Sequence, residues 1–109
     1  MIISTTETVP GAEVDEILGV VAGEAELGAT VFRDIFASIR DFVGGRAGGY
    51  QQVLRDGRVM ALDDMAEEAY QMGADAVIGV DIDYEAIGQN GSMLMVSVNG
   101  TAVRLRRAG

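Results

Sequence analysis

The segment from residue 76 to residue 86 constrains the fold of this chain most strongly, because its side chains alternate in character. Its even positions are apolar or amphipathic, whereas its odd positions become acidic from residue 81 onward. Successive residues of a β-strand point to opposite faces, so the alternation predicts a strand with one core face and one carboxylate face. The carboxylates are those of Asp81, Asp83 and Glu85.

A second alternating segment, residues 93–105, predicts a β-hairpin with the first. The Asn90-Gly91 pair is typical of a two-residue hairpin turn, but that turn would pair core positions with polar positions. A three-residue loop at 89–91 instead pairs Tyr84 with Val96 and keeps both faces consistent, since a slip of one residue exchanges the faces. We therefore predict the three-residue loop, with Gly91 in the left-handed conformation of a bulge.

Residues 16–27 form a further strand candidate that is apolar on both faces. Strict alternation places Val20 on one face, and Ile17 and Val21 on the other. Apolar residues on both faces are typical of a strand that is buried on both sides. In so small a domain, we expect another subunit to cover one of these faces.

The remaining segments complete a single α+β domain over residues 1–109. One segment has an apolar stripe at helical spacing and contains all three phenylalanines, and a longer helical segment ends at Gly73. Elements in this order predict a small antiparallel sheet with helices on one face. The predicted strands lie at about 1–6, 16–27, 75–87 and 92–105, the short helix at about 31–43 and the long helix at about 50–72.

The composition excludes several kinds of site. The chain contains no cysteine, histidine or lysine, which excludes disulfides, Cys/His zinc sites and Schiff-base chemistry. Its formal net charge of −9 argues against a nucleic-acid surface, which needs a basic footprint. No apolar run is long enough to span a bilayer, and residues 1–4 lack the basic start of a signal peptide. We therefore expect a cytoplasmic protein without nucleic-acid or membrane partners.

The acidic strand face is the first candidate site. Carboxylates on one strand face repel each other unless a cation or an arginine neutralises them, and oxygen ligands suit calcium, magnesium or manganese. The competing interpretation is a solvated acidic face, or ion pairs to arginines across a subunit boundary. We favour this second interpretation, because the spacing of acids alone is a weakly specific signal. The predicted metal ligands are Asp81, Asp83, Glu85 and Glu24.

The glycine-rich loop before the long helix is the second candidate site. Backbone N–H groups at the start of a helix attract anions, and an adjacent arginine would complete a phosphate or carboxylate pocket. No strand immediately precedes the loop, so the pattern is neither a P-loop nor a dinucleotide fingerprint. A hinge between two helices is the favoured alternative. The predicted anion-binding residues are Gly44, Gly45, Arg46 and Gly48.

Several short motifs follow one another along nearly the whole chain. They include Phe32-Arg33-Asp34, Gly44-Gly45-Arg46, Gly73-Ala74-Asp75-Ala76-Val77 and Gly88-Gln89-Asn90-Gly91-Ser92. Together these motifs resemble the YbjQ-like family of small bacterial and archaeal proteins. The resemblance implies an α+β fold related to dodecin-like subunits, a homopentamer, and a heavy-metal-binding description without an established activity. Soft metals prefer thiolates and imidazoles, which this chain lacks.

We expect a homo-oligomer, a pentamer by the resemblance, without enzymatic activity and without a bound cofactor. General acid–base chemistry could use only carboxylates or tyrosines, and no histidine or lysine is present to activate a serine or threonine. The alternative is an oligomer that binds a divalent metal ion or a small anion at its subunit interfaces. A monomer that docks on another protein through its phenylalanines is the competing class.

Overall fold

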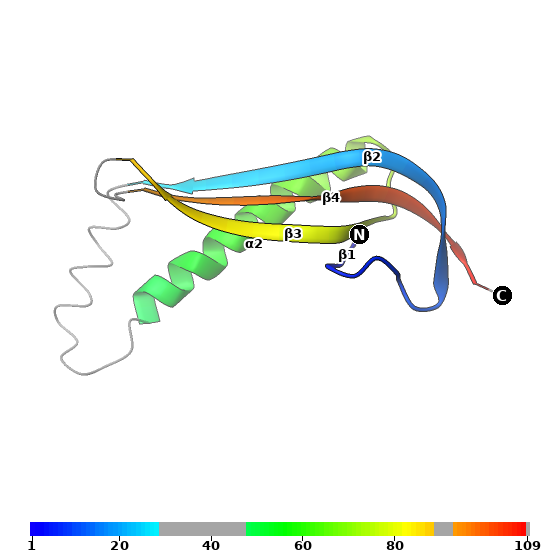
Figure 1. The fold of residues 1–109 in the computed structure, drawn as a ribbon, viewed down its shortest axis with the longest axis horizontal. Helices are drawn as coiled ribbons and strands as arrows, with labels where there is room; N and C mark the ends of the chain where they lie inside the picture. Colours follow the sequence, from blue (N-terminus) through cyan, green and yellow to red (C-terminus); the bar gives the residue numbers. More distant parts are fainter. Residues whose placement is uncertain (29–47, 89–92, 109) are drawn as a thin grey trace.

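The computed structural model describes residues 1–28, 48–88 and 93–108. Within these ranges, four strands form one sheet in the order β1-β3-β4-β2, and helix α2 lies across one face of it (Figure 1). The α+β class predicted from the sequence is confirmed. No helix in the described ranges is long and apolar enough to cross a membrane. The elements are β1 (Ile2–Ile3), β2 (Ala12–Leu27), α2 (Gly48–Gln71), β3 (Ala76–Ile87) and β4 (Met93–Arg107).

The sheet is mixed rather than wholly antiparallel. Strand β1 runs parallel to β3, whereas β4 is antiparallel to both β2 and β3. The predicted antiparallel arrangement is therefore wrong for β1. A long connection through β2 and α2 separates β1 from β3, and parallel pairing needs such a connection. Of the strand predicted at 1–6, only Ile2–Ile3 is a strand, although the backbone oxygens of Ser4 and Thr6 still accept hydrogen bonds from β3.

The predicted register of the β3–β4 hairpin is confirmed from Asp81 to Ile87. Tyr84 lies opposite Val96 and Asp83 lies opposite Ser97, as the consistency of the two faces requires. Nearer the start of β3 the predicted register is wrong, because a register shift between Ile78 and Asp81 puts Ala76 and Ile78 on the same face as the acids. The turn itself, residues 89–92, lies outside the described residues, as does the conformation predicted for Gly91. The helix predicted at 31–43 also lies outside them.

The hydrophobic core lies between α2 and the sheet face that it covers, which we call the inner face. Met65 is fully buried there against the strands, together with Val96 and Val21. The helix approaches β2 most closely at Gly23. A Cβ atom at Gly23 would collide with the carbonyl oxygen of Ala61 and would lie 2.5 Å from the backbone nitrogen of Met65. Glycine is therefore required at this position by the packing of helix on strand.

Strand β2 contains two register shifts that move its side chains between faces. The shifts lie between Val14 and Glu16 and between Ile17 and Gly19. Ile17 lies opposite Val103 and Val20 lies opposite Thr101, so both project from the face opposite to α2. The prediction that Ile17 shares a face with Val21 is wrong, because a β-bulge inserts a residue between them.

The two long strands extend beyond their predicted ends. Strand β2 begins at Ala12 rather than at residue 16, and β4 reaches Arg107 rather than residue 105. In the added segment, Glu13 lies opposite Arg106, and the Nη2 atom of Arg106 is 2.8 Å from Oε2 of Glu13. This cross-strand pair of opposite charge lies within the added part of the ladder.

Candidate functional site

The sheet face opposite to α2, which we call the outer face, carries the candidate metal ligands. Residues directly opposite each other in a ladder share a face, and the register places Glu24, Ser97 and Asp83 in one row across three strands. Two strand spacings separate Glu24 from Asp83, which is a backbone distance of about 10 Å. We call the exposed acids of this region the acidic patch; they are Glu24, Glu26, Asp81, Asp83 and Glu85.

Two members of the acidic patch interact directly. A side-chain hydrogen bond with Asp81 raises the pKa of Asp83, and the negative charge of Asp81, partial desolvation and the charge of Glu85 raise it further. A proton shared between neighbouring carboxyl groups relieves their repulsion. Among the described residues, the ion pairs of arginine lie elsewhere, between Arg104 and Glu16 and between Arg106 and the acids of β2. Within the described ranges, therefore, no arginine forms an ion pair with the acidic patch.

The chain lacks the donors that most soft and borderline metal ions prefer, and methionine thioethers are its only sulfur donors. The sequence contains no thiolate or imidazole donor, and in the described ranges no group of three or more acidic side chains is arranged to hold a metal. Asp81 and Asp83 supply two adjacent carboxyl groups, but Glu24 lies two strands away. Binding of a hard divalent cation by these residues stays a prediction.

The other half of the outer face is apolar. Ile2, Ala76, Val103 and Ile17 form one row across all four strands of the sheet. Ala76 and Val103 are buried within this row, whereas Ile17 is 70% exposed. In the next row, Val20 is 76% exposed, so the predicted burial of both faces of β2 is not met within one chain. We call the exposed residues of this region the apolar patch; they are Ile2, Val14, Ile17 and Val20.

The apolar patch was missed by sequence reasoning for a definite physical reason. Strict alternation assigns Ile17 and Val20 to opposite faces, whereas the bulge brings them to the same face. The clue in the sequence to this bulge is Gly19, a glycine inside a strand pattern, and in the structure its φ is +145°. An isolated glycine inside a strand pattern indicates a bulge or a close approach of backbone.

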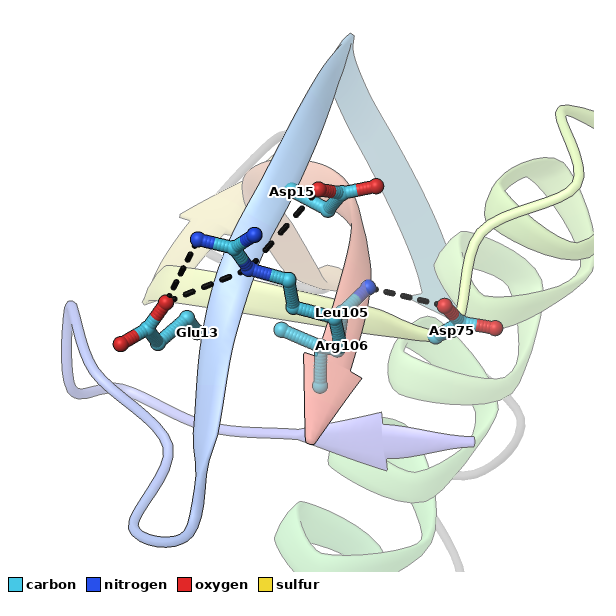
Figure 2. Close-up of polar contacts among 5 residues, drawn as sticks. All are labelled: Glu13, Asp15, Asp75, Leu105 and Arg106. Atoms are coloured by element: carbon cyan, nitrogen blue, oxygen red, sulfur yellow. Dashed lines mark hydrogen bonds and ion pairs between the residues drawn. The ribbon is translucent and has the colours of Figure 1, made fainter. Parts of the chain in front are cut away.

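A cluster of polar contacts joins the ends of the strands near the apolar patch (Figure 2). Arg106 lies between Glu13 and Asp15, with its Nε atom 3.2 Å from Oε2 of Glu13 and 3.9 Å from Oδ1 of Asp15. On the other side of β4, the backbone N–H of Leu105 donates to Oδ2 of Asp75 at 2.8 Å. These side chains are exposed, so each ion pair contributes little to stability and mainly fixes how the strands lie.

The second predicted site is described only in part. Gly44, Gly45 and Arg46 lie outside the described residues, and Gly48 is the first residue of α2. The anion site predicted for this loop therefore stays a prediction.

The curled sheet of β1–β4 and the helix α2 that covers it define a small α+β protein. A family model with the description "Putative heavy-metal-binding" matches residues 1–106, and the chain belongs to this family, the YbjQ-like family that its motifs resemble. A crystal structure of a protein with unknown function from Pediococcus pentosaceus, of the DUF74 family, has a similar fold. The two chains share 19% sequence identity with a TM-score of 0.62, and the match covers 97% of this chain and 98% of the other.

Proposed function

We propose that this protein assembles into a homo-oligomer through the apolar patch, and that it acts as an assembly rather than through a catalytic centre. The observation that carries the proposal is the exposure of Ile17 and Val20, which are 70% and 76% exposed on a row of apolar side chains. Adjacent exposed apolar side chains on a small protein are typical of an interaction surface. The resemblance to the YbjQ-like family makes five the expected number of copies.

A second copy is a suitable partner for the apolar patch on electrostatic grounds. Most of the chain's negative charge lies outside the apolar patch, and Arg104 and Arg106 balance the acids at its edge. Copies can therefore meet at the apolar patch while their acidic patches stay in solvent. Like charges facing one another at an interface would oppose the contact.

Native mass spectrometry of the wild-type protein and of Val20→Glu tests the proposal. We expect one defined oligomer for the wild type and a shift to smaller species for V20E, because the new charge would have to be desolvated at the interface. Tyr70→Glu is the matched control, since Tyr70 is 68% exposed on α2, away from the outer face. A monomeric wild type, or equal dissociation of both variants, would contradict the proposal.

A second candidate function is the binding of a divalent cation between copies at the acidic patch. The position of Asp81, Asp83 and Glu85 along one face of β3 favours it, because a cation would relieve the repulsion between these carboxylates. One chain offers only two adjacent carboxyl groups, so the remaining ligands would come from another copy. This candidate therefore needs a contact between the acidic patches of two copies, in addition to the contact through the apolar patch.

Thermal unfolding with added magnesium, calcium or manganese chloride tests the second candidate. A binding ion raises the melting temperature of the wild type in a concentration-dependent way, and Asp81→Asn removes the effect. Asp63→Asn, which removes the same charge from α2, is the control. An equal response in all three proteins would indicate ionic-strength screening and would exclude the site.

A further inference from the structure

Two free edges of the sheet are each occupied by a carboxylate from outside the strand. Strand β2 is an edge strand, and its Glu24 backbone N–H donates to Oδ2 of Asp64 on α2 at 3.0 Å. Strand β4 continues past the start of β3, and there the N–H of Leu105 donates to Oδ2 of Asp75 at 2.8 Å. An unpaired strand edge can pair with a strand of another chain, which makes these contacts informative.

The N–H of Glu24 points away from the sheet. Alternate residues of an antiparallel strand direct their backbone groups to opposite sides, so Ala22 and Glu24 share one direction. The carboxylate of Asp64 meets Glu24 from a residue 40 positions further along the chain. This contact is possible because Gly23 lets α2 pack directly on the β2 backbone at Ala61 and Met65.

Asp75 extends the β3–β4 ladder by one side chain (Figure 2). Its backbone N–H donates to the carbonyl oxygen of Val103 at 2.9 Å, as a strand residue would. Its carboxylate then accepts from Leu105, two residues further along β4, where β3 no longer provides a partner. The outward N–H of Leu105 is therefore already bonded.

We propose that Asp64 and Asp75 are edge-capping residues, which prevent a strand of another chain from pairing with β2 and with the C-terminal part of β4. An incoming strand would have to displace a charge-assisted hydrogen bond and place its own carbonyl oxygen beside a carboxylate. In contrast, β3 has no backbone hydrogen bond on its β1 side from Asp81 to Ile87 within the described part of the chain. This proposal does not depend on assembly through the apolar patch, because the caps act at the edges of the sheet and the apolar patch lies on its outer face.

Amide hydrogen exchange of the wild-type protein, followed by NMR, tests the cap on β2 directly. We expect the Glu24 amide to exchange at least ten times more slowly than the Ala22 amide, which points the same way and has no hydrogen-bond partner among the described residues. Asp64→Ala brings the Glu24 rate to that of Ala22, whereas Asp64→Asn retains an acceptor oxygen and much of the protection. Equal rates for Glu24 and Ala22 in the wild type would overturn the assignment.

A second experiment tests whether the cap controls pairing. Asp64→Ala, on an exposed helical position where alanine is well tolerated, is expected to form species larger than those of the wild type in light scattering. Adding Ala22→Pro should return the wild-type size distribution, because proline lacks the N–H group and obstructs strand addition. The melting temperature should stay at the D64A value.

The double variant separates edge pairing from simple destabilisation. If D64A associates only because it is less stable, D64A/A22P will associate at least as much, and the proposal fails. It also fails if D64A keeps the wild-type size distribution at concentrations where it is folded. Asp75→Ala and Asp75→Asn repeat the comparison for β4, with Leu105 as the reporting amide.

Discussion

The inner and outer faces of the same sheet differ in how far their apolar side chains are buried. On the inner face, Met65 and Val21 are fully buried and every strand contributes to one core beneath α2. On the outer face, the apolar patch and the acidic patch lie side by side, and Val20, the neighbour of Val21, is 76% exposed. The inner face therefore holds the core, whereas the outer face presents exposed apolar and acidic side chains to its surroundings.

The difference between the faces depends on backbone irregularities. The inner face follows the two-residue alternation of β4, and that of β3 from Asp81 to Ile87, beyond the register shift between Ile78 and Asp81. The apolar patch exists because the register shift at Leu18 brings Ile17 to the same face as Val20. The packed inner face should therefore be sensitive to changes in side-chain volume. The apolar patch should be sensitive to substitution of the glycine at the bulge.

Met65→Ala is expected to have the largest effect on stability. Met65 has no exposed surface and packs at the centre of the inner face, so its truncation leaves a cavity. We expect the free energy of unfolding to fall by about 3 kcal/mol, measured by urea denaturation. Met60→Ala is the matched control, because Met60 is 53% exposed on the same helix and should change stability by about 0.5 kcal/mol or less. Equal losses would show that burial beneath α2 is not what stabilises the sheet.

Gly23→Ala is expected to have the next largest effect. The added Cβ atom meets backbone atoms of α2, which cannot rotate away, so the helix must move off β2. We expect a loss of about 2 kcal/mol in the free energy of unfolding. Gly28→Ala is the control, since a Cβ atom there has no neighbour within 4 Å. If Gly28→Ala lowers the free energy of unfolding as much as Gly23→Ala does, the cause lies in the strand backbone and not in helix packing.

Gly19→Ala tests the bulge that separates the two faces. Gly19 has a φ of +145°, which a residue with a side chain rarely adopts, and its Cβ would lie 3.2 Å from Cε of Met72. We expect a loss of about 1 kcal/mol in stability, together with weaker self-association as Ile17 is displaced. Equilibrium unfolding and native mass spectrometry measure the two effects. Unchanged association with reduced stability would separate the apolar patch from the bulge.

The sequence predicted the regular half of this structure. The α+β class, the long helix and the register of the hairpin from Asp81 to Ile87 follow from periodicity and from the need to keep Tyr84 opposite a core residue. The parallel pairing of β1 and the bulge in β2 did not follow, because a two-residue period cannot locate an inserted residue. The contact of Asp64 with Glu24 joins residues 40 positions apart, and no local pattern in the sequence encodes it.

The candidate site was predictable only as a set of residue types. Alternation placed the β3 acids on one face, and the register confirms that they share the outer face with Glu24. The distance between Glu24 and Asp83 depends on β4, which lies between β2 and β3 in the sheet, and the spacing of acids along the chain does not reveal that order. Sequence spacing therefore overestimated how closely these carboxylates approach.

Asp83→Asn is expected to have the smallest effect, and its sign depends on pH. The pKa of Asp83 is raised in the folded state, first by the hydrogen bond with Asp81 and then by its charge, so the folded protein binds this proton more tightly than the unfolded chain does. The stabilisation is therefore fully present below the unfolded pKa and is lost as the pH rises through the folded pKa. We expect D83N, which cannot ionise, to melt slightly above the wild type at pH 7 and to lose this advantage near pH 3.

Circular dichroism melting curves at both pH values measure this prediction. Asp63→Asn on α2 makes the same change in net charge away from the outer face, so the difference between the two variants isolates the acidic patch from the overall charge of the chain. The advantage of D83N should shrink in 1 M sodium chloride, because salt screens exposed charges. If D63N melts as D83N does at both pH values, the net charge of the chain would account for the effect, and the acidic patch would have no special role in stability.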